Sequence, residues 1–177
     1  MNRPPMDARY SGVAIAFHWS IALLVIANLA IGLVPPLRFL MSAHKAIGIT
    51  ILFATFARLA WRIAHRAPPL PPGTPAWEKG AAHAAHWGLY LLLIAMPLSG
   101  WAMVSGSAKR RPLDWFGAFD IPYLPVSGAV GQAGHTMHEL FGWVMLALVV
   151  LHIAAALRHH LWLRDDVLRR MIPTTRR

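Results

Sequence analysis

The sequence alternates between long apolar stretches and short polar segments, and four of the apolar stretches are long enough to cross a membrane. They cover residues 12–34, 43–64, 82–106 and 136–161, and their few charged residues lie mostly near their ends. A helix rises about 1.5 Å per residue, so about 20 residues span the hydrocarbon core of a bilayer. We therefore predict an all-α fold, an integral membrane four-helix bundle that forms one domain over residues 1–177.

The segments between these stretches contain helix-breaking and interfacial residues. The connector 67–76 (APPLPPGTPA) is too rich in proline to be helical. The longest predicted loop, 108–134, is expected to lie along the membrane interface because it carries four aromatic residues. These are Trp115, Phe116, Phe119 and Tyr123.

The first apolar stretch is predicted to be a retained membrane helix and not a signal peptide. The hydrophobic core of a signal peptide has about 7–15 residues, and this stretch is longer. It also lacks a clear A-x-A cleavage site before Pro35 and Pro36, the prolines that end it.

Composition supports the membrane interpretation and excludes several kinds of chemistry. Hydrophobic residues make up 56% of the chain and charged residues 14%, compared with about 25% charged in soluble domains. The chain has no cysteine, which excludes disulfides, thiolate-bound iron–sulfur clusters, covalent CxxCH haem attachment and thiol catalysis. A metal must therefore be bound mainly by the ten histidines or by carboxylates.

The formal charge of +10 is concentrated at the ends of the apolar stretches, so we expect no nucleic-acid partner. Four helices place both termini on one side, with twelve Lys and Arg residues there and five on the other side. The positive-inside rule then places both termini in the cytoplasm, together with a short C-terminal surface helix at 164–172. The twelve are Arg3, Arg9, Arg58, Arg62, Arg66, Lys79, Arg158, Arg164, Arg169, Arg170, Arg176 and Arg177.

Histidines within the apolar stretches are the candidate metal ligands. His138 and His152 are fourteen residues apart on one helix, which puts both rings on nearly the same face and separates them by about 21 Å. With the predicted topology, His152 matches His18 in depth on the inner side, and His138 matches His44 on the outer side. Two histidine pairs at two depths are what two six-coordinate b-type haems require.

Two alternatives compete with this prediction. Each histidine alone could form an interhelical hydrogen bond. Zinc is the rival metal, but a zinc site needs four clustered ligands and not two separated pairs. Gly48 and Gly142 each follow a predicted ligand by four residues, where a flat macrocycle needs room or where helices pack closely.

The remaining histidines suggest a second site near the inner surface. His86, Trp87, His159 and Trp162 are candidates for a quinone or proton site, with His83 and Trp19 close by in the predicted topology. A titratable histidine pair, His159 and His160, could deliver protons to a quinone. His86 could instead bond haem propionates or compete with His18 as a ligand, and the tryptophans could be interfacial anchors.

The chain resembles the prokaryotic cytochrome b561 family along nearly its whole length. The resemblance rests on FHW at 17–19, HKAIGI at 44–49, AHAAHWGLYLLLIAMPLSG at 82–100, HELFG at 138–142, LHIAAALRHH at 151–160 and RRMIP at 169–173. It implies a four-helix bundle in the bacterial inner membrane with two haem b groups. The implied iron ligands are the four histidines paired above, His18 with His152 and His44 with His138.

The resemblance also implies electron transfer between the quinone pool and a partner outside the membrane. Some similar proteins are regarded as superoxide oxidases, which pass an electron from superoxide to ubiquinone. Five cations on the outer side could attract such a small anion, although they could equally contact lipid headgroups. They are Arg38, Lys45, Lys109, Arg110 and Arg111.

We therefore expect an oxidoreductase that moves electrons from superoxide, or another periplasmic donor, to ubiquinone. An alternative is a cytochrome b subunit that relays electrons between a partner hydrogenase or dehydrogenase and the quinone pool. A histidine-lined metal transporter ranks last, because no carboxylate lies within the uncharged stretches.

Overall fold

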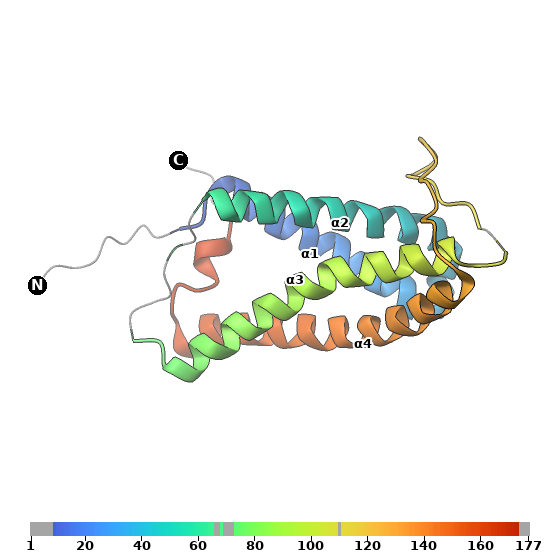
Figure 1. Cartoon of the computed structure of the whole chain (residues 1–177). Helices are drawn as coiled ribbons and strands as arrows, with labels where there is room; N and C mark the ends of the chain where they lie inside the picture. Colours follow the sequence, from blue (N-terminus) through green and yellow to red (C-terminus); the bar gives the residue numbers. More distant parts are fainter. Residues whose placement is uncertain (1–8, 66–67, 69–72, 110, 174–177) are drawn as a thin grey trace, which may run out of the picture.

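The computed structural model describes residues 9–65, 68, 73–109 and 111–173, and it is built from four long helices. These are α1 (Gly12–Leu33), α2 (Met41–Ala64), α3 (Ala76–Ser105) and α4 (Gly128–Arg158). Short helical turns follow α1 and α4: the 3₁₀ helix η1 (Pro35–Leu40), the π-helix η2 (His159–Leu163) and the 3₁₀ turn η3 (Arg169–Met171). All four long helices are long and apolar enough to span a membrane, which confirms the predicted fold class (Figure 1).

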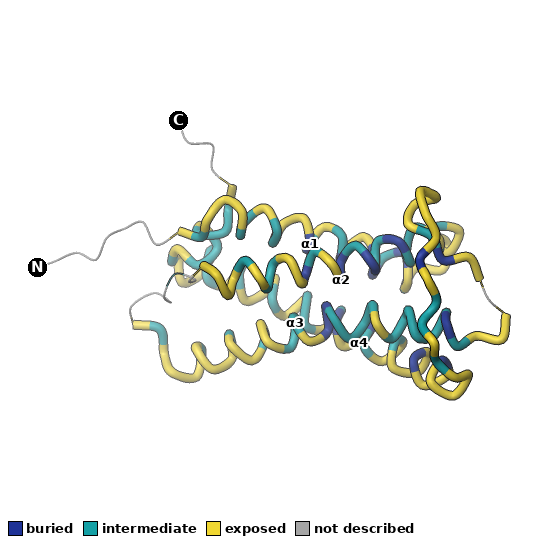
Figure 2. Tube along the Cα trace, turned by 45° about the horizontal axis from the view of Figure 1, so that its top comes forward, coloured by how far each residue is buried: buried dark blue, intermediate teal, exposed yellow. Residues whose placement is uncertain are grey.

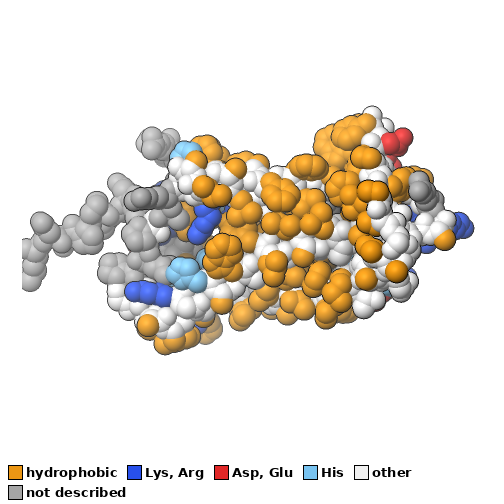
Figure 3. Space-filling view, in the orientation of Figure 1, with side chains coloured by type: hydrophobic (Ala, Val, Ile, Leu, Met, Phe, Trp, Pro, Cys, Tyr) orange, Lys and Arg blue, Asp and Glu red, His pale blue; other side chains and the backbone are white. Residues whose placement is uncertain are grey.

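The helices run antiparallel as a bundle in which α1 packs on α2 and α3 packs on α4. Side chains from all four helices meet in one small apolar core, which includes Ile21, Val25, Ile51, Leu93 and Met145. Much of the outer surface is exposed and hydrophobic (Figures 2 and 3), with Ile63, for example, 86% exposed. Such an apolar exterior is unfavourable in water and favourable in lipid, so the bundle has the surface of a membrane protein.

The two ends of the described chain lie at the same end of the bundle. The Arg9 guanidinium donates hydrogen bonds to the carbonyl oxygens of Arg169 (3.1 Å) and Ile172 (3.2 Å). The Trp19 indole N–H donates to the carbonyl oxygen of Met171 at 2.6 Å. The C-terminal segment therefore crosses from the end of α4 to the beginning of α1.

Two helices begin earlier than the hydrophobic pattern predicts. We expected the third helix from residue 82, but α3 begins at Ala76, directly after Pro75. We expected the fourth helix from residue 136, but α4 begins at Gly128, where the Ser127 hydroxyl caps the helix by accepting a hydrogen bond from the Val130 N–H. The apolar runs mark only the lipid-spanning part of each helix, whereas prolines and capping residues determine where the helix begins.

The predicted loop at 108–134 and the predicted tail helix at 164–172 are both shorter in the structure. The connection between α3 and α4 covers residues 106–127, and the tail contains only the single 3₁₀ turn η3. In this connection the Trp115 indole N–H donates to the Thr50 hydroxyl at 3.0 Å, so the loop folds back on α2. Half of the proline-rich connector (67 and 69–72), together with Arg3, Arg66, Arg110, Arg176 and Arg177, lies outside the described residues.

Candidate functional site

His44 and His138 face each other across the bundle at the end away from the termini. Their ring centroids are 6.0 Å apart, with an angle of 83° between the ring planes. His44 Nδ1 donates to the backbone oxygen of Asn28 (3.1 Å), and His138 Nδ1 donates to the backbone oxygen of Met96 (3.0 Å). A carbonyl only accepts hydrogen bonds, so each ring carries its proton on Nδ1 and keeps the lone pair of Nε2 free.

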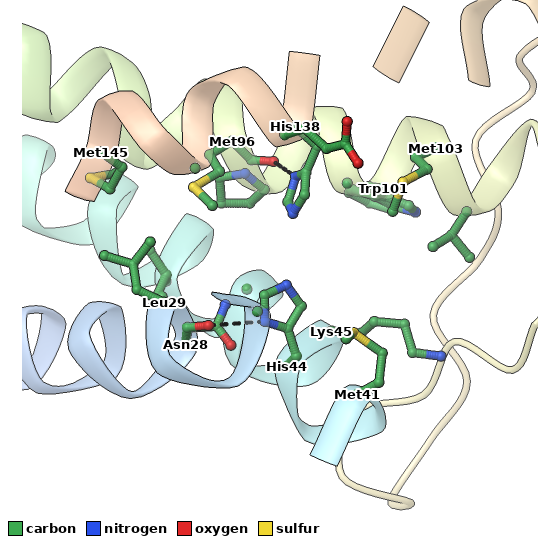
Figure 4. A pocket seen from close by; sticks show the side chains of 18 of the residues that line it. Asn28, Leu29, Met41, His44, Lys45, Met96, Trp101, Met103, His138 and Met145 are labelled. Carbon is green, nitrogen blue, oxygen red and sulfur yellow. Dashed lines mark hydrogen bonds between the residues drawn. The ribbon is translucent and has the colours of Figure 1, made fainter. Parts of the chain in front are cut away.

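This is the arrangement that a metal-binding histidine needs. The second ring nitrogens of His44 and His138 point toward each other, while Asn28 and Met96 hold the far side of each ring (Figure 4). When two imidazoles on opposite sides of the same metal ion each bind it at about 2 Å, their ring centroids lie about 6 Å apart. The outer pair therefore fits bis-histidine ligation in both spacing and protonation.

Glycines on the neighbouring helices make room for these two rings. A Cβ on Gly32 would lie 3.2 Å from His44 Cε1, and a Cβ on Gly100 would lie 2.9 Å from His138 Cε1. Gly48 and Gly142, predicted from the sequence to leave room for a macrocycle or for close helix packing, both line the cavity around this pair, and a Cβ there would make only ordinary contacts of 3.7 Å with Asn28 and Met96. Gly32 and Gly100 were missed because their importance depends on which helices are neighbours.

A large cavity surrounds the outer pair. Its volume is about 1060 Å³, similar to the upper range of about 300–1,000 Å³ for small-molecule and cofactor sites. His44 and His138 line it together with apolar side chains from all four helices, such as Leu29, Ile51, Leu93 and Met145. The cavity thus offers an apolar space and two convergent nitrogen ligands.

Several cations belong to the lining of this cavity. Arg38, Lys45 and Arg111 belong to its lining, as do His135 and Glu139. The Lys45 ammonium also donates to the backbone oxygen of Pro112, which ties the beginning of α2 to the connection between α3 and α4. Lys109, the fourth described cation of the predicted group, does not line the cavity.

His18 and His152 form the second predicted pair, at the end near the termini. Their ring centroids are 6.2 Å apart, and both side chains are half-buried. His86 lies beside them, with its ring centroid 5.7 Å from that of His152, but it is exposed. Spacing therefore allows either His18 or His86 to share a metal with His152, and burial favours His18.

The inner pair differs from the outer pair in its hydrogen bonds. Arg58 lies 3.1 Å from His18 Nδ1 and 3.2 Å from the Tyr90 hydroxyl. A guanidinium only donates, so His18 accepts at Nδ1 and carries its proton on Nε2. His18 Nε2 can bind a haem iron only after this proton leaves. The inner pair therefore has the ring spacing that haem ligation needs but not the protonation state.

The four residues predicted for a quinone or proton site are distributed around the end near the termini. His86 contacts His152, and His159 Nδ1 lies 2.6 Å from the Asp165 carboxylate. Trp87 and Trp162 are 72% and 79% exposed, in positions where lipid would surround them. Trp19, considered with them, is bound to the C-terminal segment through Met171.

Within the described residues, no group of three or more histidine and carboxylate side chains is arranged to hold a metal ion. The inward-facing histidines instead form two pairs of neighbouring rings, one pair near each end of an apolar bundle. Fold and site together define a membrane protein built to hold redox cofactors between helices, the class to which transmembrane b-type cytochromes belong.

Comparison with known proteins agrees with this class. The family model for prokaryotic cytochrome b561 matches residues 9–174, and the chain belongs to this family. It is 35% identical to cytochrome b561 homolog 2 of Escherichia coli, an alignment that covers 93% of this chain and 91% of the relative. It is 31% identical to the probable superoxide oxidase CybB of Yersinia pestis, covering 97% and 99% of the two chains. A second Escherichia coli relative, cytochrome b561 homolog 1, is 29% identical over 93% of this chain and 97% of the relative. The protein is therefore a bacterial transmembrane electron-transport cytochrome, and the family implies haem b as its cofactor.

Proposed function

We propose that the protein binds two haem b groups and carries electrons across the inner membrane to ubiquinone. His44 and His138 would hold the outer haem, and His18 and His152 the inner haem. The observation that carries this proposal is the outer pair, whose spacing and Nδ1 hydrogen bonds already match bis-histidine ligation. The haem supplies one-electron chemistry, and the chain supplies the ligands, the apolar surroundings and the access paths.

We further propose that superoxide is the donor on the outer side. Three cations line the outer cavity, and a positive potential in a binding cleft raises the encounter rate of a small anion. The name of the Yersinia pestis relative, probable superoxide oxidase, agrees with this substrate. In the proposed reaction, superoxide gives one electron and leaves as O₂.

The inner side would then be the site of quinone reduction. Two electrons, delivered in two turnovers, and two protons convert ubiquinone to ubiquinol. His86, Trp87, His159 and Trp162 are the residues proposed to contribute to this site, because His86 contacts the inner pair and the others lie at the same end. Under the positive-inside rule, this end faces the cytoplasm.

The donor is tested by following haem reduction after a pulse of superoxide. The variant that combines Arg38→Gln, Lys45→Gln and Arg111→Gln should slow the second-order rate about 10-fold or more and reduce its dependence on salt. Lys109→Gln is the matched control, since Lys109 lies outside the cavity lining, and should leave the rate unchanged. An unchanged rate in the triple variant would contradict steering of superoxide, and a stoichiometric periplasmic partner on purification would favour the cytochrome-subunit alternative.

A further inference from the structure

The end of α4 holds a histidine–carboxylate pair that the ligand pairs do not use. His159 Nδ1 and Asp165 Oδ2 are 2.6 Å apart, and the two side chains are 19% and 27% exposed. The other carboxylate oxygen, Asp165 Oδ1, accepts a hydrogen bond from the Val167 N–H at 3.0 Å. The carboxylate is therefore held on one side by the backbone and on the other by the imidazole.

The backbone departs from regular helix to build this pair. The helix changes from α to π over His159–Leu163 and ends at Arg164, a non-glycine residue in the left-handed conformation with φ 52°. π-turns and left-handed non-glycine residues cost free energy and often occur at functional sites. Here they turn the chain back so that Asp165 reaches a ring six residues earlier.

His159 lies on the same face of the helix as the inner ligand. Seven residues separate it from His152, which is about two helical turns and about 10 Å. The C-terminal segment that starts at Asp165 continues to Met171, where it accepts a hydrogen bond from Trp19, the residue after His18. The pair therefore lies between the inner histidines and the aqueous phase at that end.

We propose that His159 is the proton donor for quinone reduction and that Asp165 is its positioning residue. Asp165 accepts a hydrogen bond from Nδ1–H and so orients the ring with Nε2 toward the substrate, as carboxylates do for catalytic imidazoles elsewhere. In each step His159 gives the quinone a proton from Nε2 and takes its replacement there from water, while the Nδ1 proton stays on the ring. Ubiquinone receives two electrons and, through His159, two protons taken up from water. This inference rests on the proposed quinone reductase function.

The experiment uses the full-length protein loaded with haem and reduced chemically. Reoxidation is followed optically with either ubiquinone-1, which needs protons, or ferricyanide, which takes single electrons without protons. Asp165→Asn and His159→Ala should slow reoxidation by ubiquinone-1 about 10-fold to 100-fold and leave the ferricyanide rate unchanged. Asp165→Glu should restore much of the rate, and imidazole added to the buffer should restore His159→Ala.

The adjacent carboxylate provides a matched control. Asp166 is exposed and lies 3.7 Å from Arg169, so Asp166→Asn should keep the wild-type rate. A readout without turnover is nitrogen NMR of labelled histidine, in which Asp165→Asn should abolish the Nδ1-protonated preference of His159. If Asp165→Asn fails to load haem, His159→Ala with and without imidazole decides the question.

Wild-type rates with ubiquinone-1 in both variants would overturn the inference. Equal slowing with ferricyanide, or a His159→Ala protein that imidazole does not restore, would also overturn it and assign the pair to the structure of the helix end. If quinone fails to reoxidise even the wild-type protein, the proposed function itself is wrong, which is a distinct result.

Discussion

At the scale of single residues, the outer histidines that we propose as haem ligands are held by backbone oxygens and packed against glycines. His138 is held by the Met96 carbonyl and approaches α3 at Gly100, where there is no side chain to displace it. The outer neighbours of a metal ligand typically change metal affinity about 10-fold to 100-fold when altered. The absence of a side chain at Gly100 therefore leaves the space that the His138 ring occupies.

Replacing Gly100 with alanine should weaken binding of the outer haem. The new Cβ would lie 2.9 Å from the His138 ring, so the ring must move out of its ligating position. We expect about a 10-fold loss of affinity for one of two haems, measured by haem titration of the apoprotein. Gly80→Ala on the same helix is the control, because a Cβ there meets nothing within 4 Å. Equal haem binding by the two variants would contradict this role of Gly100.

The four histidines could be selected from the sequence, whereas the two glycines that contact their rings could not. Ionisable rings inside apolar runs are costly in a membrane, so the four histidines proposed as ligands can be selected from their positions in the chain. Gly32 and Gly100 look like the many other glycines of membrane helices. Only the packing of α1 on α2 and of α3 on α4 shows that these two face histidine rings.

At the scale of elements, α3 and α4 cross closely where both lack side chains. A Cβ on Gly131 would lie 2.8 Å from the Gly106 Cα, and a Cβ on Gly134 would lie 2.8 Å from the Ser99 carbonyl oxygen. From the sequence, this glycine-containing segment is predicted to be part of a loop because it precedes the apolar run. Small residues that allow close helix packing are instead part of α4.

Alanine at Gly131 should destabilise the bundle. The added methyl group has backbone atoms on the other side, which cannot yield as a flexible side chain could. We expect a loss of about 1–3 kcal/mol, measured by unfolding in detergent. Gly128→Ala provides the comparison, since its Cβ would contact only the Gly106 oxygen at 3.7 Å and should cost much less. Equal stability of the two variants would show that this crossing tolerates a side chain.

At the scale of the whole molecule, four membrane-spanning helices place both ends of the described chain on one side and the α3–α4 loop on the other (Figure 1). Apolar length and positive flanks made this architecture predictable from sequence. The C-terminal segment was less predictable, because contacts across the bundle, such as Arg9 with Arg169, hold it in place.

Single cysteines can test the orientation, because the natural chain has none. Ala118, in the α3–α4 loop, and Ala76, at the beginning of α3, are both exposed. In intact cells whose outer membrane has been made permeable, an impermeant thiol reagent should label Ala118→Cys and not Ala76→Cys. Labelling of Ala76→Cys alone would reverse the proposed orientation.

The most direct test of the central claim is a reduced-minus-oxidised optical spectrum with haem quantitation on the purified protein and its histidine variants. We predict two b-type haems per chain, with His138→Ala perturbing one and His18→Ala perturbing the other, while His86→Ala retains both. Loss of a haem in His86→Ala but not in His18→Ala would reassign the inner ligand. A protein that binds no haem when haem is available would contradict the paired-ligand account altogether.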